Sequence, residues 1–540
     1  MALSKHVDPE ELLRHLDERP ATQGANVYDS ASHHTRHFTY GSRYQAGVHI
    51  PKFEIPENGT DGTSVRQLIK DELDLDGRPN LNLASFVNTY MEPTADQLFM
   101  ENISKNLADA DEYPAIMAIH SRCVSMLANL WKIPKGQTAI GAATTGSSEG
   151  IHLGGLAMKR LWQEKRRREG KSTENPNIIM GANAQVALEK FARYFEVEPR
   201  ILPVSEESHY CLDAKLIREN IDENTIGIFI ILGSTYTGHY EPVAEIAKIL
   251  DDYEAETGTY IPIHVDAASG GFVAPFVNFD QPWGFEIPRV HSIQCSGHKF
   301  GLVYPGLGWV LWRGEEYLPK ALVFELHYLG GVEETFTLNF SRPAAQVVVQ
   351  YYNFLMLGKE GYSNIMRNCL QNARILSKAL EKSGWFTCVS DIHRRKGVWS
   401  LSEPSPDAME PEFYNPGLPV VTFRFSDAFK QHYKHVKQQS VSTLLRARGY
   451  IIPNYTLPPM VENVEVLRVV VRESMSADLL DQLIRDIFIV TETLTGADEV
   501  DLEAFARARA PRIEKVLQSM GLPQRRNSWG GPGAVLRTTC

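Results

Sequence analysis

The sequence predicts an α/β protein in which a large domain with a mostly parallel sheet is followed by a smaller αβ domain. The chain of 540 residues is longer than one ordinary hydrophobic core accommodates, so more than one domain is expected. Expected strands alternate with expected helices, which is typical of a parallel sheet covered by helices. These elements are a helix from 146 to about 168, a strand at 177–180, a helix at 184–194, a strand at 227–232, a helix at 243–257 and a strand at 261–265. Ligands of such sheets bind at the carboxyl ends of the strands.

Composition and hydrophobic spacing divide the chain into four segments. Residues 1–65 mix short helical pieces with Pro and Gly and are expected to form a partly flexible arm. Residues 66–358 are expected to form the large, ligand-binding domain, and residues 359–495 the small αβ domain. Residues 496–540 contain a basic stretch and a Gly/Pro-rich end, so we expect a mobile extension.

Hydrophobic periodicity predicts the remaining elements. The large domain is expected to open with three helices, at 64–74, 95–106 and 114–131. The small domain is expected to contain a helix at 362–382, a strand at 420–425, a helix at 431–449, a strand at 466–471 and a helix at 477–494.

Charge and composition restrict the possible partners. The formal net charge of −11 argues against a non-specific nucleic-acid binder, because binding phosphates needs a basic face. No apolar run approaches the roughly 20 residues of a membrane helix, and the first 20 residues lack the apolar core of a secretory signal. The six cysteines are scattered without metal-site spacing, which is typical of free thiols in a reducing compartment. We therefore expect a cytoplasmic protein with a small-molecule ligand and no metal.

The strongest local motif is the segment Ser296–Gly301, in which Lys299 lies on a tight, Gly-containing stretch. An isolated lysine is most often a surface charge. Here, however, an apolar strand upstream ends at Asp266 and is followed by small residues and two glycines. A buried carboxylate at a strand end needs a cationic partner, and a protonated pyridine nitrogen is such a partner.

The segment Thr144–Glu149 supplies a third part of the pattern. Gly146 permits close approach of a ligand, Ser147 and Ser148 carry hydroxyls, and a helix begins immediately afterwards. Backbone N–H groups and the helix dipole favour a phosphate at such a turn. Taken alone, the segment is better explained as an ordinary Ser N-cap with Glu in the first turn. Together with Asp266 and Lys299, it addresses the phosphate, ring nitrogen and aldehyde of pyridoxal phosphate, so this cofactor is predicted.

From about residue 66 to 485 the chain resembles the glutamate decarboxylases, which are pyridoxal-phosphate-dependent group II decarboxylases. The segments that carry the resemblance are Asn82–Phe86, Ser104–Pro114, Thr145–Met158, Lys190–Tyr194, Thr235–Gly238, His264–Pro275, Ser296–Gly301 and Tyr328–Arg342. The resemblance implies the aspartate-aminotransferase-like, type I fold, with a seven-stranded sheet in the large domain. It also implies decarboxylation of L-glutamate to 4-aminobutyrate and CO2.

The resemblance assigns cofactor-binding roles to residues at matching positions. Lys299 would bind the cofactor aldehyde covalently, and Asp266 would face the pyridine nitrogen. The phosphate would be held by Ser147, Ser148 and Ser296, with Ser341 reaching across from a second subunit.

Three further residues would lie beside the cofactor. Gln185 would stack over the ring, although a solvent-facing helix glutamine is the alternative explanation of the same residue. Thr235 and His298 would lie next to the cofactor and the α-carboxylate of the substrate.

Arg468 occupies an apolar strand of the small domain, where an unpaired charge would be costly. It either forms an internal ion pair or grips the substrate α-carboxylate with two parallel hydrogen bonds, and the resemblance implies the second role. Four residues correspond to the region that recognises the distal carboxylate: Ser85, Phe86, Asn106 and Asp109. Ser85 replaces the threonine of bacterial members but keeps the hydroxyl.

The implied reaction assigns work to three residues. Arg468 would hold the α-carboxylate out of the ring plane, because only a bond perpendicular to the ring is weakened by it. Lys299 or His298 would then return a proton to Cα. The alternatives are a decarboxylase of another acidic or aromatic amino acid, a transaminase, and a non-catalytic scaffold homologue.

The resemblance also bears on assembly and regulation. The fold needs at least a homodimer to complete its site, so a homodimer or a higher homo-oligomer with shared sites is expected. Plant members carry a C-terminal calmodulin-binding segment, and this tail has seven basic residues from Arg507 onward together with Trp529. Because Pro511 and Pro523 interrupt any long amphipathic helix, we expect a solvated tail rather than a calmodulin site. Closure of the site by a terminal histidine, as in bacterial members, is not expected, because this chain ends in Cys540.

Overall fold

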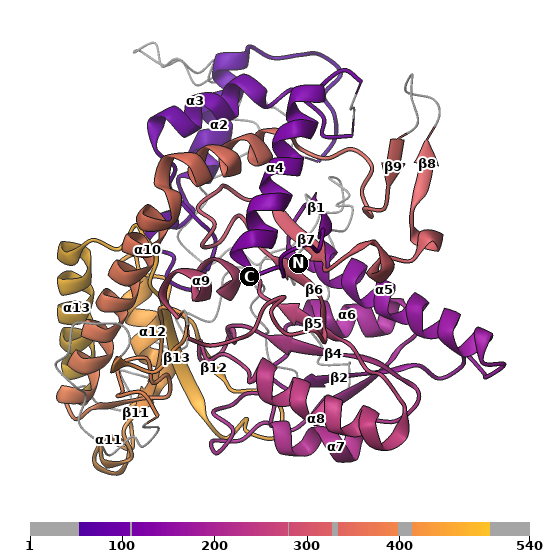
Figure 1. The fold of residues 1–540 in the computed structure, drawn as a ribbon. Helices are drawn as coiled ribbons and strands as arrows, with labels where there is room; N and C mark the ends of the chain where they lie inside the picture. The colour runs from indigo at the N-terminus through magenta and orange to yellow at the C-terminus, as the bar shows by residue number, and fades with distance from the viewer. Residues whose placement is uncertain (1–52, 109–110, 279, 327–332, 398–412, 497–540) are drawn as a thin grey trace. The chain divides into compact units, whose positions relative to one another are not determined.

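A computed structural model describes residues 53–108, 111–278, 280–326, 333–397 and 413–496 (Figure 1). These residues belong to two units, one containing residues 53–78 and Gly496 and the other residues 79–495. The first unit contains helix α2 (Gly62–Leu73), whose N-terminus is capped by the Asp61 carboxylate accepting from the Ser64 backbone N–H at 3.0 Å. The domain limits expected from the sequence stay predictions.

A seven-stranded sheet forms the centre of the second unit. Its spatial order is β1-β7-β6-β5-β4-β2-β3. The strands are β1 (Ile140–Thr144), β2 (Asn177–Gly181), β3 (Glu198–Leu202), β4 (Thr225–Ile231), β5 (Ile263–Asp266), β6 (Val290–Cys295) and β7 (Gly308–Trp312). Only β7 runs antiparallel to its neighbours, β1 and β6, whereas the other neighbouring pairs are parallel. The predicted large, mostly parallel sheet is confirmed.

The strands of this sheet are apolar because both faces are covered. All seven residues of β4 are buried, as are all residues of β2, β5, β6 and β7. The covering helices are α4 (Pro114–Leu130), α5 (Ser147–Arg168), α6 (Val186–Tyr194), α7 (Ile217–Asn220) and α8 (Val243–Thr257). Helix α5 packs closely on the strands because it contains Gly154, where a methyl group would collide with the His264 ring of β5.

The direction of the strands determines where ligands can bind. Because β1 and β6 are both antiparallel to β7, β1 runs in the same direction as β6 and the parallel strands beyond it. The segments that follow six of the seven strands therefore emerge at one edge of the sheet. In α/β proteins this edge holds the ligand.

Helix α10 (Ala345–Lys382) links the large sheet to the small domain. It contacts α3 (Pro93–Asn102), α4 and α9 (Ala274–Val277), and also β10 (Phe386–Cys388), β11 (Val420–Phe425) and α13 (Ala477–Thr495). Gly358 interrupts the helix with φ 58° and ψ −171°, a conformation that glycine adopts without the steric cost other residues would meet. The predicted helix at 362–382 is the part of α10 beyond this kink.

The small domain is built on a four-stranded antiparallel sheet with the order β10-β11-β13-β12. Its remaining elements are β11 (Val420–Phe425), β12 (Asn454–Thr456), β13 (Glu465–Val470), α11 (Asp427–His432), α12 (Gln438–Ala447) and α13 (Ala477–Thr495). The shorter elements elsewhere are β8 (Phe324–Leu326), β9 (Glu333–Thr335) and the 3-10 turns η2 (Pro79–Leu81), η3 (Ala214–Leu216), η4 (Gly270–Phe272), η5 (Glu315–Tyr317) and η6 (Lys320–Leu322).

The prediction of one helix at 431–449 is wrong, because the chain turns between α11 and α12. Val436 is buried in this turn, and the Tyr433 ring packs on Phe429, with 4.9 Å between the ring centroids. The buried Gln438 side chain opens α12 and accepts a hydrogen bond from the Phe425 backbone N–H at 2.7 Å. Tertiary burial therefore overrides local helical periodicity here.

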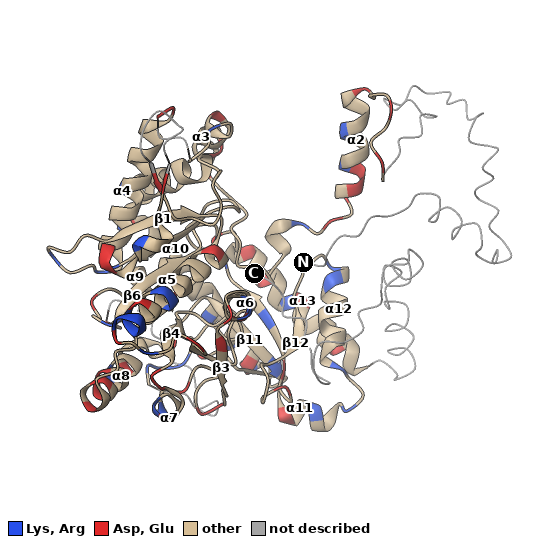
Figure 2. Cartoon of the chain, turned by 90° about the vertical axis from the view of Figure 1, so that its right-hand side faces the viewer, with Lys and Arg blue, Asp and Glu red and all other residues tan. Residues whose placement is uncertain are grey.

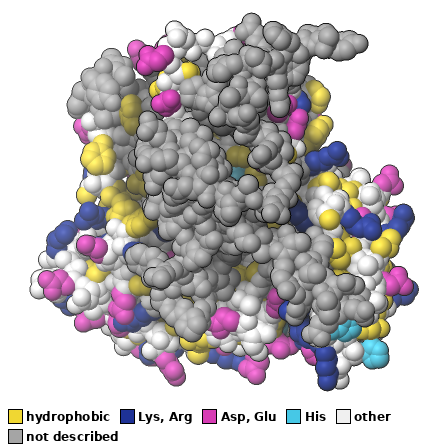
Figure 3. All heavy atoms as spheres, turned by 180° about the vertical axis from the view of Figure 1, so that it is seen from behind, with side chains coloured by type: hydrophobic (Ala, Val, Ile, Leu, Met, Phe, Trp, Pro, Cys, Tyr) yellow, Lys and Arg dark blue, Asp and Glu magenta, His cyan; other side chains and the backbone are white. Residues whose placement is uncertain are grey.

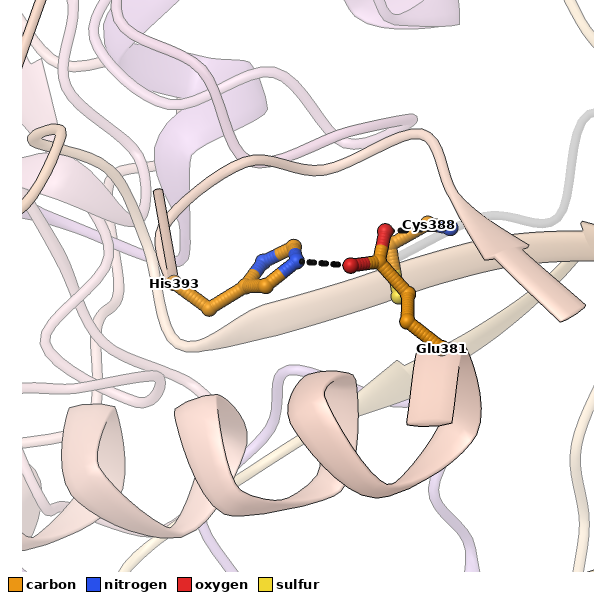
Figure 4. A group of neighbouring side chains, drawn as sticks. All are labelled: Glu381, Cys388 and His393. Atoms are coloured by element: carbon orange, nitrogen blue, oxygen red, sulfur yellow. Dashed lines mark hydrogen bonds and ion pairs between the residues drawn. The ribbon is translucent and has the colours of Figure 1, made fainter. Parts of the chain in front are cut away.

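A buried polar cluster ties α10 to the small sheet (Figure 4). Glu381 accepts hydrogen bonds from His393 Nε2 at 3.0 Å, Arg394 Nη2 at 2.5 Å and the Cys388 backbone N–H at 3.2 Å. Side-chain atoms of Glu381, Cys388 and His393 lie within 4.8 Å of one another, as metal ligands do. Because the Glu381 carboxylate is already shared among three donors, one of them an arginine, we interpret the cluster as a structural link.

Charged side chains lie on several helices, among them α5 and α8 (Figure 2). The last turn of α5 carries Lys165, Arg166, Arg167 and Arg168, which complement the negative end of the helix dipole. Arg166 is nevertheless buried and pairs with Glu223 at 2.9 Å. Within the described ranges, no helix combines the length and apolarity that crossing a membrane requires.

We expect Glu381→Gln to lower the free energy of unfolding by about 3 kcal/mol, because it removes the carboxylate from a buried arginine and a buried histidine. Glu256→Gln is the matched control, since Glu256 pairs with Arg218 on the surface, where a loss below about 1 kcal/mol is expected. Urea unfolding of both variants tests this difference. Equal losses would show that the cluster adds no more than a surface pair.

Candidate active site

Asp266 lies at the end of β5, on the edge where the co-directed strands terminate. Its Oδ1 accepts hydrogen bonds from the Ala268 backbone N–H at 3.1 Å and from the Gln294 side chain. Burial raises the pKa of this carboxyl group, and the nearby Lys299 charge opposes that rise. Among the described residues both bonds end on Oδ1, so Oδ2 is the oxygen that suits a cationic ligand group.

Lys299 lies in the turn that follows β6. The side chain is 5% exposed, and its Nζ lies 5.6 Å from the centroid of the Phe86 ring. Within the part of the chain that the structure describes, Nζ makes no hydrogen bond or ion pair. A buried amine without such a partner, close to a buried carboxylate, is suited to react with a ligand rather than to support the fold.

Arg468 lies in β13 and is 2% exposed. Its Nη1 donates to the Thr235 carbonyl at 2.6 Å and its Nη2 to the Ala84 carbonyl at 2.5 Å. The guanidinium carbon lies 5.1 Å from the centroid of Phe86. Among the described residues no carboxylate pairs with Arg468, so an internal ion pair does not account for its burial. The Phe86 ring therefore lies near both a buried lysine and a buried arginine.

His298 immediately precedes the lysine and is held by main-chain contacts. Its Nδ1 accepts a hydrogen bond from the Leu307 backbone N–H at 3.3 Å. Burial, aided by the Lys299 charge, lowers the pKa of this imidazole to about 4. With Nδ1 accepting, the proton of the neutral ring is assigned to Nε2, which can donate to a ligand.

A phosphate-sized anion would find donors at the start of α5. Gly146 occupies the N-cap position without a side-chain cap, and both serines follow within the helix, so neither serine is the ordinary N-cap that was the alternative. Ser147 is buried and Ser148 is exposed. A methyl group on Gly146 would approach the His298 ring at 3.2 Å, which places this turn next to the lysine segment.

Ser296 follows β6 at the same edge of the sheet. It is fully buried, and its Oγ has no hydrogen-bond partner among the residues described. Its backbone N–H donates to the Ala268 carbonyl at 3.1 Å, two residues beyond Asp266. An unsatisfied buried hydroxyl is costly, so the Ser296 hydroxyl suits a hydrogen bond to a ligand.

Gln185 and Thr235 follow β2 and β4 at the same edge. Gln185 is half-buried and caps α6, accepting from the Ala187 backbone N–H at 2.6 Å. It is therefore not a solvent-facing helix glutamine. Thr235 is half-buried and contributes its carbonyl to Arg468.

The predicted distal-carboxylate residues fall into two groups. Phe86 lies near both Lys299 and Arg468, and Ser85 precedes it in the chain. Ser85 Oγ accepts a hydrogen bond from the Val87 backbone N–H at 3.1 Å. Asn106 instead donates from Nδ2 to Ser341 Oγ at 3.3 Å, and Ser341 is exposed. No contact within the described ranges joins this pair to Lys299 or Arg468. Asp109 lies outside the described residues.

The sequence-based prediction missed two residues of this region. Gln294 hydrogen-bonds Asp266 from the neighbouring strand, and the only sequence signal is a polar residue in an apolar strand. Glu149 is buried beside the phosphate-type turn and accepts from the Thr145 backbone N–H at 2.8 Å. The sequence does not distinguish Glu149 from an ordinary acidic residue, because acidic residues are common in the first turn of a helix.

The residues at this edge suit a ligand with three chemically different parts. Asp266 suits a cation, the uncapped start of α5 and Ser296 suit an oxyanion, and Lys299 suits an electrophilic carbonyl. Pyridoxal phosphate has these parts in its ring nitrogen, phosphate and aldehyde, so the residues present fit this cofactor. The buried Arg468 guanidinium suits a carboxylate.

Comparison with known proteins agrees with this geometry. A family described as "Pyridoxal-dependent decarboxylase conserved domain" matches residues 56–399. The glutamate decarboxylase of Saccharomyces cerevisiae is 50% identical, with 83% of this chain and 80% of the yeast protein covered. The glutamate decarboxylase of Petunia hybrida is 46% identical, with 84% and 85% covered.

Solved structures agree as well. The glutamate decarboxylase of Lactobacillus brevis superposes with a TM-score of 0.76 at 35% identity, covering 84% of this chain and 97% of that structure. A sphingosine-1-phosphate lyase of Burkholderia pseudomallei superposes with a TM-score of 0.65 at 19% identity, and this likeness shows the fold alone.

We expect the His298 imidazole to stay neutral from pH 8 down to about pH 5, because burial holds its pKa near 4. Histidine-labelled protein followed by NMR checks this, with His298→Gln identifying the signal. The effect on stability has a definite sign. As the pH falls below the ordinary histidine pKa of about 6.5, the unfolded state gains a proton that the folded state does not, so His298 lowers stability between about pH 6.5 and 4. Titration of the folded-state signal near 6.5 would contradict the burial argument.

Proposed function

Because the chain belongs to the family of pyridoxal-dependent decarboxylases and matches glutamate decarboxylases over most of their length, we propose that it converts L-glutamate to 4-aminobutyrate and CO2 with pyridoxal phosphate as cofactor. The observation that carries the proposal is the Arg468 guanidinium. It is buried without a carboxylate partner in the described structure and shares the Phe86 ring with Lys299. An amino acid bound near Lys299 would supply the carboxylate partner that Arg468 lacks among the described residues.

The cofactor would be held by residues from several strand ends. Lys299 would bind its aldehyde, and Asp266 would keep a proton on the ring nitrogen. The phosphate would be held by Ser147, Ser148 and Ser296, and Gln185 would cover the ring from the end of β2. When bound, pyridoxal phosphate supplies an electron sink that allows a bond at Cα to break.

The remaining residues would decide which bond breaks. A guanidinium has five N–H donors, and carbonyls take only one from each Nη of Arg468, so donors remain for the α-carboxylate. Thr235 is positioned by the same guanidinium. Arg468 would orient the α-carboxylate so that this group, rather than the Cα proton, is the one lost.

Return of a proton to Cα would fall to Lys299 or His298. The neutral His298 ring carries its proton on Nε2, because Nδ1 accepts from Leu307. A neutral imidazole also adds no second positive charge beside Lys299. Lys299 would also provide the amine that holds the cofactor after the product has left.

The distal carboxylate of glutamate would be recognised by Ser85, Phe86, Asn106 and Asp109. Asn106 is bonded to the exposed Ser341, and neither contacts Lys299 of the same chain within the described residues. We infer that this pair enters the site of a second subunit in a homodimer or a higher homo-oligomer. Ser341 would then reach the phosphate, and Asn106 the substrate, of the partner.

Exposed apolar side chains support such an assembly. Hydrophobic side chains appear on the surface between charged ones (Figure 3). Met100 of α3 and Leu355 of α10 are 64% and 60% exposed, and these two helices are in contact. Burying them against a second copy would remove apolar surface from water.

We also propose a cytoplasmic location for the protein. The five described cysteines are buried free thiols, which agrees with a reducing compartment and supports placement in the cytoplasm. A calmodulin-binding role for the C-terminal tail remains disfavoured by its prolines. The tail lies outside the described residues.

CO2 release by the purified protein with added pyridoxal phosphate tests the proposal. We expect release from glutamate to exceed release from aspartate, cysteine sulfinate and tyrosine by at least about 100-fold, because unpaired buried polar groups penalise the wrong substrate. Lys299→Ala should abolish release. Release chiefly from another amino acid would overturn the substrate, and no release from any of them would favour a non-catalytic homologue.

Arg468→Lys should lower kcat/KM for glutamate by roughly 10- to 100-fold, because a lysine cannot replace the planar two-pronged contact of arginine with a carboxylate. Cofactor absorbance should remain, since Lys299 and Asp266 are unchanged. Arg424→Lys in the neighbouring strand β11 is the matched control, because Arg424 pairs with Asp427 at 2.6 Å, away from Lys299. Similar kinetics for both variants would remove Arg468 from the substrate site.

A further inference from the structure

Glu149, the third residue of α5, joins two segments that are distant in sequence. Its Oε2 accepts from the Thr145 backbone N–H at 2.8 Å and from Thr145 Oγ1 at 3.0 Å. Its Oε1 accepts from the backbone N–H groups of Leu338 at 3.0 Å and Asn339 at 3.4 Å. The side chain is 6% exposed. One buried carboxylate therefore ties the turn before α5 to a segment about 190 residues further along the chain.

The second segment, residues 338–342, is also hydrogen-bonded to Asn106 and its neighbour Leu107. The Arg342 backbone N–H donates to Asn106 Oδ1 at 3.0 Å, and the Leu107 backbone N–H donates to the Arg342 carbonyl at 2.8 Å. Arg342 Nη1 returns to the end of β1 by donating to the Ala143 carbonyl at 2.9 Å. Hydrogen bonds through Glu149 therefore connect residues 338–342 and Asn106 to the turn at Thr145.

We propose that Glu149 is a positioning residue that couples the phosphate-binding turn of one subunit to the Asn106–Ser341 pair that this subunit presents to its partner. The inference rests on the proposed function, because it assumes a phosphate at the turn and a site shared between subunits. Binding of the cofactor phosphate at this turn in one subunit positions the Asn106–Ser341 pair of the same subunit. That pair then completes the site of the partner subunit. Cofactor binding and dimer formation therefore strengthen each other.

The hydrogen-bond pattern requires a carboxylate at this position. The three backbone groups that Glu149 accepts from are donors only, and the Thr145 hydroxyl also donates. A glutamine offers one accepting oxygen and one donating NH2 group, so it faces backbone N–H groups with a donor on one side. Glu149→Gln keeps the shape of the side chain and breaks one half of the link.

An ordinary stabilising role predicts a different result. Acidic residues in the first turn of a helix interact favourably with its dipole, and their loss affects stability only. Glu245, the third residue of α8, is exposed and provides this comparison at the same helix position. Glu245→Gln changes the same charge in the same helical context without touching the turn at Thr145.

The coupling is measured without using activity. The dimer dissociation constant is determined by sedimentation with fluorescence detection, for the full-length protein with and without pyridoxal phosphate. Affinity for pyridoxal phosphate is determined by absorbance titration of the cofactor-free protein. Because coupling is reciprocal, the factor by which the cofactor tightens the dimer equals the factor by which the dimer tightens cofactor binding.

We expect the cofactor to tighten the wild-type and Glu245→Gln dimers by about 10-fold or more, which is within the usual range of coupling between sites. In Glu149→Gln the factor should fall to about 2-fold or less, with weaker cofactor binding. Thr145→Val removes one hydroxyl donor from an exposed residue, so it should fold normally and show an intermediate factor. This second variant keeps the test decisive if Glu149→Gln does not fold.

Two results overturn the inference, and they differ in what else they affect. A wild-type factor retained in both Glu149→Gln and Thr145→Val, whatever the change in thermal stability, reduces Glu149 to a helix-capping residue and leaves the proposed function standing. Absence of a cofactor absorbance band, or of any dimer, in the wild-type protein removes the coupling together with the proposed shared site.

Discussion

The buried carboxylate of Asp266 is the constraint from which the rest of the site follows. A carboxylate removed from water is stable as an anion only if hydrogen bonds and a positive charge compensate its lost hydration. Here Gln294 and the Ala268 backbone N–H provide the hydrogen bonds, and the positive charge of Lys299 opposes the rise in the Asp266 pKa. The lysine has no hydrogen bond to the carboxylate, so the compensation is incomplete until a cationic ligand group arrives. The fold holds Asp266 in this state because β5 is central in the sheet and buried on both faces.

The small domain completes the site through one guanidinium. Arg468 donates to a carbonyl that follows β4 and to a carbonyl that precedes Phe86, so three segments of the second unit meet at this side chain. Its partners are neutral carbonyls, which keep its positive charge uncompensated. That arrangement is costly for a structural arginine, but it suits one that receives a carboxylate from a substrate. The Phe86 ring lies near both cations, 5.6 Å from Lys299 Nζ and 5.1 Å from the Arg468 guanidinium carbon.

The buried carboxylates of Asp266, Glu149 and Glu381 have different roles. Asp266 uses only one oxygen within the protein and leaves the other for a ligand, whereas Glu149 and Glu381 use both oxygens within the protein. The same functional group therefore serves binding in one place and structure in the others. The difference lies in the number of donors that the surrounding backbone presents.

The sequence alone determined the class of the fold and the chemistry at its centre. Alternating elements imply a mostly parallel sheet, and short motifs such as Ser296–Gly301 and Thr144–Glu149 are readable because each gathers its functional groups within a few residues. The helix boundary between α11 and α12, the antiparallel direction of β7, and the partners of Glu149, Gln294 and Arg468 were not readable. These features depend on contacts between residues tens to hundreds of positions apart, and burial at those contacts outweighs local preference. Only the tertiary structure decided that Arg468 lacks an ion-pair partner among the described residues, because a strand sequence shows that a charge is buried but not what lies opposite it.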